Sequence, residues 1–374
     1  MARQGYDEVV LLTGYPAFGA RQMLARILDA EPRTLVYAVV RAKLARTADD
    51  HLATLPAAHR ARVVLLDGDA AHMDLGLSGA ELRVLAGEVD RIHHIAQVSY
   101  QGADRAAAEL VNVGATREIL ELAAACHGLR ALVHHSVAAV SGDRTGLVRE
   151  DELEHGQKFR NVVEETKARA EKLVRASKRV PWAIVRPTTL IGDSVTGEVE
   201  RLDGPYLLVL LILTSPAEIA IPLPGRGDAP LHLVPVDWAT RAAHHIGRDP
   251  RALGKTFHLV DPDPLTAKQV FELVARAGGK RSPRGFIPVN LTRALLATPG
   301  LERFAKSPRA FLDQLVTPVR YDARNADEIL AGSGITCPAF ATYVDAMVTY
   351  VRARVDERRA EQTAPAAEAD DALS

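Results

Sequence analysis

The sequence predicts an α/β protein with a doubly wound parallel sheet and a smaller C-terminal lobe. Apolar, β-branched runs alternate with helical patterns through the first half of the chain. These runs are continuously apolar, as in strands that are buried on both faces of a parallel sheet. The first run is followed by a glycine turn and an amphipathic helix, the context of a dinucleotide-binding site. The 374 residues, 47% of them apolar, suffice for one large domain or two smaller ones.

The predicted strands share short runs of valine, leucine and isoleucine. They are EVVLL near residue 8, TLVYAVV near 34, RVVLL near 62, RIHHIA near 91, RALVHHSV near 130 and PWAIVR near 181. Between them, stretches such as RQMLARILDA and DRAAAELVNVGATREILELAAACHG carry apolar residues at three- and four-residue spacing, which predicts amphipathic helices.

The pattern changes after Arg186 and Pro187, where proline and glycine become frequent. We therefore predict a nucleotide-binding domain formed by residues 1–196 plus 231–262 and a substrate lobe formed by residues 197–230 plus 263–352. Residues 353–374 are highly charged and poor in large apolar side chains, which predicts a frayed or disordered tail.

Composition excludes several classes of function. The formal net charge is −1 and charged residues are interspersed, which argues against a nucleic-acid partner. The two cysteines, Cys126 and Cys337, form no metal-binding motif, so we expect no metal. The first residues do not resemble a signal peptide, and the longest apolar run, residues 206–213, is too short to span a bilayer. We expect a cytoplasmic protein without a membrane span.

The turn after the first strand reads TGYPAFGA and departs from the glycine pattern T-G-x-x-G-x-x-G. Gly14 keeps the first glycine, whereas Ala17 places a methyl group where the backbone approaches a pyrophosphate, and Ala20 occupies the helix-packing position. The alternative is a turn that only connects strand and helix. The residues of the turn that we expect at the cofactor are Gly14, Tyr15, Pro16, Ala17, Phe18 and Gly19.

Basic residues follow the second predicted strand, where NAD-binding proteins place an acidic residue. Arg41, Lys43 and Arg46 precede the first acidic residue, Asp49, which favours NADP over NAD because arginine accommodates the 2′-phosphate. The alternative is that these side chains are solvated. Asp69, after the third strand, is expected to reach the adenine or to start a turn.

A lysine is predicted within the apolar stripe of a helix. Asn161 and Glu164 have the spacing of a capping box, so a helix should begin near Val162. Lys167 then shares a face with Val163. A buried ammonium group needs water or a dedicated polar partner, and the hydroxyl groups of a ribose would serve.

These features together resemble the extended short-chain dehydrogenase/reductases, specifically the thioester-reductase and male-sterility (fatty acyl-CoA reductase) branch. The resemblance covers about residues 7–265. It is carried by LLTGYPAFGA, IHHIAQVS, LVNVGATREILELA, HHSVAAVSGDRTG, FRNVVEETKARAEKLV, VRPTTLIGDSVTGE and VPVDWAT. It implies a Rossmann-type domain that binds NADP(H), with Ala96, Pro187 and Thr188 also at the cofactor, and an acyl or aldehyde small molecule as substrate. It further implies pairing through the helices of residues 103–126 and 161–178, as a homodimer or as a heterodimer with an active relative.

The catalytic triad that the resemblance implies is Ser or Thr, Tyr and Lys, and two of its three positions are altered. The hydroxyl position, five residues before Gly142, is Val137, and the tyrosine position is Val163, so only Lys167 remains. None of the eight tyrosines lies on or near this helix in the sequence. Strand alternation directs Ser136 away from the face of residue 137. Because loss of one oxyanion donor costs on the order of 100- to 1000-fold in rate, we expect no ordinary carbonyl reduction.

Three functions are compatible with this pattern. The first is an NADP(H)-binding pseudoenzyme, redox sensor or partner of an active paralogue. The second is an NADP-dependent oxidoreductase or lyase, acting on an acyl-thioester or aldehyde-type substrate, whose acid comes from the substrate, from water or from an unrecognised residue. The third is a structural module that binds no nucleotide.

Overall fold

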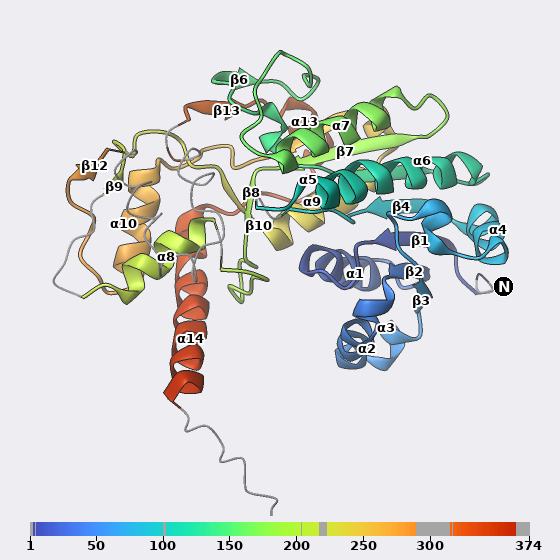
Figure 1. Ribbon diagram of the computed structural model, residues 1–374, viewed down its shortest axis with the longest axis horizontal. Coiled ribbons are helices and arrows are strands. Elements are labelled where there is room, and N and C mark those ends of the chain that lie inside the picture. The colour runs from blue at the N-terminus through green and yellow to red at the C-terminus, as the bar shows by residue number, and fades with distance from the viewer. Residues whose placement is uncertain are drawn as a thin grey trace, which may run out of the picture.

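The structure is a computed structural model that describes residue 3 and residues 5–99, 102–202, 204–216, 223–288, 315 and 317–363. Its centre is a seven-stranded sheet in the order β11-β7-β5-β4-β1-β2-β3, with all strands parallel (Figure 1). The strands are β1 (Glu8–Thr13), β2 (Thr34–Val40), β3 (Val63–Asp67), β4 (Arg91–His94), β5 (Ala131–His135), β7 (Trp182–Pro187) and β11 (Thr256–Leu259). The predicted doubly wound, Rossmann-type sheet is confirmed.

Helices cover both faces of the sheet, as the continuously apolar strands require. One face packs against α1 (Phe18–Ala30), α2 (Ala45–Thr54), α9 (Val236–Arg248) and α13 (Arg324–Leu330). The other face carries α4 (Gly79–Glu88), α6 (Ala115–Ala125) and α7 (Val162–Ala176). The short helices α3 (Ala57–Arg60) and α5 (Arg105–Ala108) lie in the connections. Alternate residues of β1 supply the two cores: Val10 and Leu12 face α1, whereas Val9 and Leu11 face α4 and α6.

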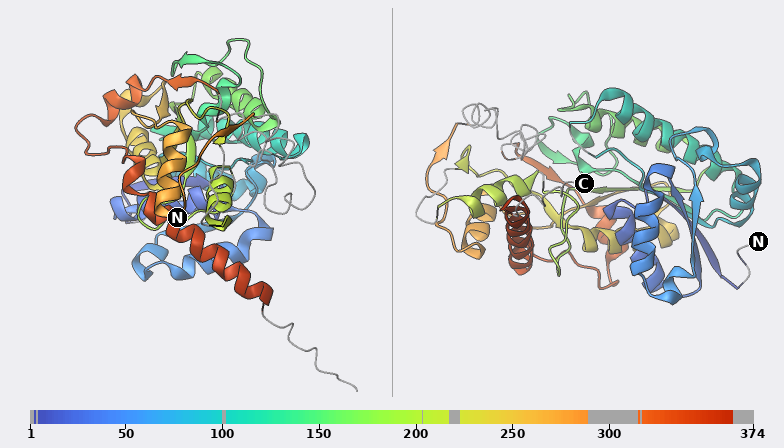
Figure 2. Two further views of the ribbon diagram at one scale, coloured as in Figure 1. Left: turned by 90° about the vertical axis from the view of Figure 1, so that its left-hand side faces the viewer. Right: turned by 60° about the horizontal axis from the view of Figure 1, so that its bottom comes forward.

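A further apolar cluster lies beyond the sheet and joins three helices (Figure 2). These helices are α8 (Pro205–Thr214), α10 (Ala267–Ala277) and α14 (Val344–Thr363). Three small parallel pairs complete the described strands: β8 (Thr189–Ile191) with β10 (Leu233–Pro235), β9 (Leu223–Pro224) with β12 (Phe286–Ile287), and β6 (Gly146–Val148) with β13 (Val319–Tyr321).

The helix α14 continues past residue 353, where the sequence predicts the start of a disordered tail. The segment RARVDERRAEQT is rich in alanine, arginine and glutamate, which are strong helix formers, so the helix continues although most of residues 352–357 are exposed. Its end projects from the body of the molecule (Figures 1 and 2). The remainder of the predicted tail, residues 364–374, lies outside the described residues.

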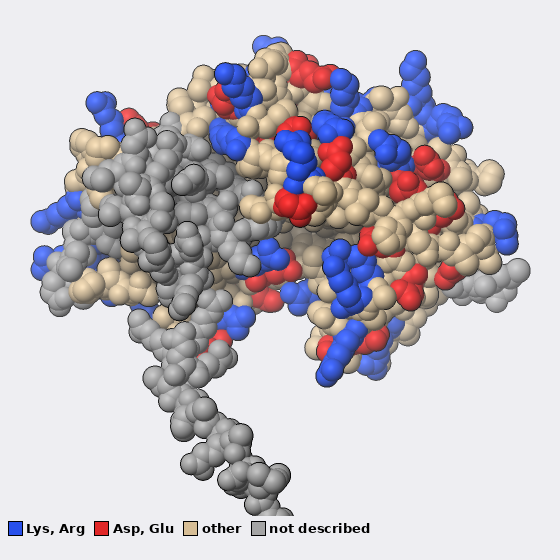
Figure 3. Space-filling model, viewed as in Figure 1, with Lys and Arg blue, Asp and Glu red and all other residues tan. Residues whose placement is uncertain are grey.

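Surface charge and helix hydropathy bear on whether the chain binds nucleic acid or a membrane. Basic and acidic side chains are interspersed on the face shown in Figure 3, without a large region of one sign. Within the described ranges, every helix is too short or too polar to traverse a bilayer.

Candidate cofactor and catalytic site

The predicted site residues gather where the strand order reverses. In a doubly wound sheet, ligands bind outside the carboxyl ends of the strands at this reversal, which here lies between β1 and β4. Gly14 follows β1, Ala96 follows β4, and Val137 follows β5. Lys167 reaches the same edge from α7. The structure therefore brings the glycine turn, Val137 and Lys167 to the edge of the sheet where proteins of this architecture have their ligand crevice.

Gly14 is required by the close approach of two loops. Its φ is +88°, and a Cβ atom there would lie 2.8 Å from the backbone nitrogen of Ala96. Thr13 fixes this contact, because its Oγ1 accepts hydrogen bonds from the N–H groups of Ile95 and Ala96, each at 3.1 Å. The turn after β1 and the loop after β4 are thereby held together.

Tyr15 does not offer its side chain to a cofactor. The ring is buried in the core beneath the turn, where its hydroxyl donates to the carbonyl of Ala48 at 3.2 Å and lies 2.7 Å from Nδ1 of His51. Only the backbone of Tyr15 can face the crevice. Pro16 is buried as well.

The alanine at position 17 leaves the start of α1 able to receive a phosphate. Ala17 is exposed and has a φ of −59°, so its methyl group causes no backbone strain. The first backbone hydrogen bond of the helix runs from Arg21 to the carbonyl of Ala17, and no side chain caps the end. The N–H groups of Phe18 and Gly19 thus remain for a ligand, and the helix dipole favours an anion. This arrangement fits a pyrophosphate.

The predicted basic residues lie at the carboxyl end of β2, beside the turn. Arg41 is half-buried and precedes the 3₁₀ turn η1 (Ala42–Leu44), on which Lys43 is exposed. Arg46 is exposed and lies 4.0 Å from Asp50. At the end of β3, the carboxylate of Asp69 accepts a hydrogen bond from the N–H of Ala71 at 3.0 Å, which is the turn-forming role that the sequence leaves open.

Lys167 is a buried amine that donates a hydrogen bond to one side chain among the described residues. Its side chain is 3% exposed, and Nζ donates to Oε1 of Gln97, in the loop after β4. Burial lowers the pKa of Lys167 to about 7, and the charge of Glu171 opposes this shift only in part. The sequence predicts the burial and the need for a partner, but it does not identify Gln97.

Two neutral histidines lie beside the lysine. The rings of His94 on β4 and His134 on β5 stack at 5.5 Å. Burial, and then the charge of Lys167, lower the pKa of His134 to about 3; burial also holds the pKa of His94 well below its usual value. Nδ1 of His94 is 2.9 Å from Oγ1 of Thr13. Both rings therefore stay uncharged and add no acid to the site at neutral pH.

The two valines place only aliphatic groups at the positions that the family resemblance assigns to the triad hydroxyls. Val163 is 5% exposed and lies one turn before Lys167 on α7. Val137 is half-buried and precedes the 3₁₀ turn η4 (Ala138–Ser141). The neighbouring Ser136 is buried, and its hydroxyl donates to Glu171. Ser136 is thereby engaged on the sheet side of α7 and does not replace the missing hydroxyl.

Glu171 belongs to a buried ion pair beneath α7. Arg186 on β7 donates to both of its carboxylate oxygens at 2.6–3.0 Å, and the two side chains are 0–1% exposed. This pair anchors the helix on the sheet and engages both carboxylate oxygens of Glu171. At the end of β7, Pro187 and Thr188 are buried, and the hydroxyl of Thr188 lies 3.5 Å from the carbonyl of Leu259.

Asn112 links α7 to the loop that contains Gln97, a role that the sequence analysis missed. Its Oδ1 accepts from the N–H of Val98 at 2.8 Å, and its Nδ2 donates to Oγ1 of Thr166 at 2.9 Å. It lies in the π-helical turn η3 (Glu109–Gly114), a geometry common at functional sites. The available signal was an asparagine in the otherwise apolar segment LVNVG.

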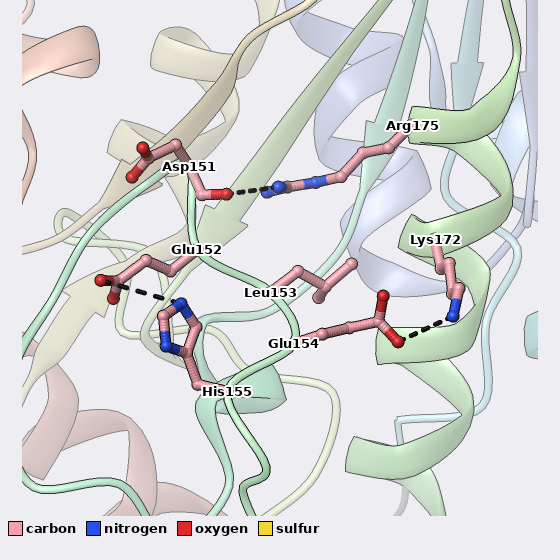
Figure 4. Close-up of a pocket in the computed structure, with 7 residues that line it drawn as sticks. All are labelled: Asp151, Glu152, Leu153, Glu154, His155, Lys172 and Arg175. Carbon is pink, nitrogen blue, oxygen red and sulfur yellow. Dashed lines mark hydrogen bonds and ion pairs between the residues drawn. The ribbon is translucent and has the colours of Figure 1, made fainter.

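A polar cleft of about 490 Å³ lies elsewhere, between residues 151–155 and the second half of α7 (Figure 4). Two of its basic side chains are already engaged: Lys172 contacts Glu154 at 2.7 Å, and Arg175 donates to the carbonyl of Asp151 at 2.6 Å. None of the predicted site residues lines it.

The strand order, the glycine turn and the helix-borne lysine define a class of protein, the NAD(P)-binding Rossmann proteins of the extended short-chain dehydrogenase/reductase type. Comparison with known proteins agrees. A model of the family described as male sterility protein matches residues 12–243. The chain belongs to this family and is an extended short-chain dehydrogenase/reductase of the thioester-reductase branch, as its motifs predict.

Relatives of known name are mostly much longer than this chain. A linear gramicidin synthase polypeptide of Brevibacillus parabrevis is 27% identical over 302 residues, which cover 74% of this chain and 6% of that protein. Glycine betaine reductase ATRR of Emericella nidulans is 30% identical over 231 residues, 59% of this chain and 18% of that protein. Among solved structures, the terminal R domain from the myxalamid PKS-NRPS biosynthetic pathway superimposes with a TM-score of 0.76 at 26% identity, covering 97% and 93% of the two chains.

Proposed function

We propose that the chain binds NADP(H) in the crevice at the end of β1 and β4 but performs no ordinary carbonyl reduction. Gly14 and the start of α1 would hold the pyrophosphate, and Lys167 would meet the ribose hydroxyl groups. The single observation that carries the proposal is that Lys167 is buried, while valine occupies positions 137 and 163, where the family resemblance leads us to expect the two hydroxyl donors.

The choice of NADP rests on charge. Arg41 and Lys43 would contact the 2′-phosphate, and no acidic residue occupies the end of β2 to bind an unphosphorylated ribose. Asp69, Ala96, Pro187 and Thr188 would line the remainder of the cofactor.

We expect no ordinary reduction because the site lacks, at positions 137 and 163, a group that could protonate the product of hydride transfer. Hydride addition to an aldehyde makes an alkoxide, which must be stabilised and then protonated. A valine side chain can do neither. Without turnover of any substrate, the protein would act as a sensor of the cofactor or as the partner of an active relative, with the helices over residues 103–126 and 161–178 as the pairing surface.

A fluorescence titration with NADPH, followed by NADPH consumption with aldehydes and acyl-thioesters, tests the proposal. We expect saturable binding and no turnover of aldehydes. Aldehyde turnover near one per second would contradict the loss of ordinary reduction, and absence of binding would favour the structural-module alternative.

One observation favours a second candidate, a reductase with a non-standard donor. The loop after β4 places the amide of Gln97 against Lys167, in the crevice where both hydroxyls are missing. An amide N–H can donate a hydrogen bond to a substrate oxygen.

A further inference from the structure

We propose that Gln97, aligned by Lys167, is the hydrogen-bond donor to the substrate oxygen, and that it limits the site to reducing acyl-thioesters to aldehydes. The inference rests on the proposed NADP(H) site and names the residue that would bind the substrate oxygen there. It concerns a residue that lies outside the triad and outside the predicted cofactor contacts.

The geometry fixes which end of the amide is free. An ammonium group donates only, so Nζ of Lys167 must meet Oε1 of Gln97. The Nε2 group is then directed away from the lysine, and within the described ranges of the chain it has no hydrogen-bond partner. Gln97 is half-buried, so its side chain is not fully enclosed by the protein.

The lysine also strengthens the donor. A bond from a cation to the amide oxygen polarises the amide and increases the positive character of its N–H groups, more so where water is excluded. The side chain of Lys167 is itself held on α7 between the buried positions Val163 and Glu171. The amide is therefore oriented before a substrate arrives, as an oxyanion donor must be.

An amide N–H stabilises an oxyanion but does not release its proton at neutral pH, and this difference selects the substrate. In a thioester, hydride from NADPH forms a C–H bond while the carbonyl electron pair moves to oxygen. The oxyanion then re-forms the carbonyl, the C–S bond breaks, and the thiolate leaves with the electron pair. The products are an aldehyde, a thiolate and NADP⁺, and the reaction balances without a proton.

Reduction of the aldehyde to an alcohol would not balance in the same way. The alkoxide has no thiolate to expel, and its conjugate acid is about as weak as bulk water. A thiol, by contrast, has a pKa of about 8.5, so its thiolate is a competent leaving group near neutral pH. The site should therefore stop after one two-electron step.

The test compares Gln97→Met, which removes the donor, with Gln97→Glu, which keeps a partner for Lys167 but offers no N–H. Gln22→Met on α1 is the matched control, because it makes the same chemical change away from the crevice. Aldehyde and alcohol are quantified in single-turnover reactions of NADPH-loaded protein with an acyl-thioester. Equilibrium binding of the thioester and of the thioether lacking the carbonyl oxygen is measured with NADP⁺ present.

We expect aldehyde without alcohol from the natural sequence and from Gln22→Met. Both Gln97 variants should form aldehyde on the order of 100-fold more slowly. In Gln97→Met, NADPH affinity should stay unchanged and thioester binding should fall to that of the thioether.

Three results would overturn the inference: NADPH binding without aldehyde formation, alcohol as the main product, or Gln97 variants as fast as the control. The first of these leaves the proposed function intact, whereas failure to bind NADPH removes both.

Discussion

At the scale of single residues, the site depends on an amine that is held in a dry environment. Lys167 is 3% exposed. The neighbouring histidines His94 on β4 and His134 on β5 carry no positive charge at neutral pH, because the pKa of each is lowered. The sequence predicted the burial from the apolar stripe of the helix. It could not predict the partner, because Gln97 is 70 residues away in a loop without local periodicity.

The lowered pKa of Lys167 predicts a pH-dependent stability. Its folded pKa is about 7, against 10.5 as the ordinary value, so between these pH values the unfolded chain binds more protons than the folded chain. The free energy of unfolding contributed by this residue should therefore rise with pH from about 7 to 10.5. Lys167→Met should be at least as stable as the natural sequence at pH 7 and should lack this rise.

Urea unfolding of both proteins at several pH values, without nucleotide, measures the effect. Parallel pH profiles for the two proteins would show that the amine is exposed to water in solution. In either case the same variant should lose NADPH affinity if the amine meets the ribose.

At the scale of secondary-structure elements, α7 is the scaffold of the site. The sequence predicted its start at Val162, and the structure confirms it, with Asn161 capping the N–H of Glu164 at 3.0 Å. Its attachment to the loop after β4 through Asn112 was not predicted, because that contact depends on how two elements pack. The burial of the Tyr15 ring could not be predicted for the same reason, since its hydroxyl group bonds to Ala48 and therefore depends on where α2 packs.

Asn112→Ala should loosen this attachment. The N–H of Val98 and the hydroxyl of Thr166 would each lose a partner, which costs about 1–3 kcal/mol of unfolding free energy for a buried group. NADPH affinity should fall as well, because the loop after β4, which carries Ala96, would no longer be held against α7, which carries Lys167.

Asn161→Ala is the matched control, because it removes only a helix cap worth about 1 kcal/mol and leaves the attachment in place. Equal stability of Asn112→Ala and the natural sequence in urea would contradict a structural role for the link.

At the scale of the whole molecule, the sequence predicted the parallel sheet and its helical layers, because the buried strands and the glycine turn are local patterns. The helix over residues 353–363 was not predicted, because the high charge of this segment indicated disorder, whereas its residues also have high helix propensity. Most of residues 289–316, part of the predicted substrate lobe, lie outside the described residues.

Restoring the triad tests whether the rest of the molecule still supports reduction. Val163→Tyr combined with Val137→Thr should raise NADPH-dependent aldehyde reduction on the order of 100-fold, since both substrate-binding hydroxyls return beside Lys167. The rate of NADPH oxidation is the measurement, with Val163→Phe combined with Val137→Thr as the control lacking the phenol hydroxyl. Tight NADPH binding without any gain would show that the substrate lobe has diverged too.

The central claim is that a ribose meets Lys167 in a crevice that lacks a hydroxyl donor. A crystal soaked with NADPH tests it most directly through the electron density around Nζ and the nicotinamide C4. We predict density for the nucleotide with its ribose hydroxyls within hydrogen-bonding distance of Nζ, and Val137, Val163 and the amide of Gln97 around C4. An amine in contact only with bulk water, or a serine, threonine or tyrosine hydroxyl directed at C4, would contradict the account.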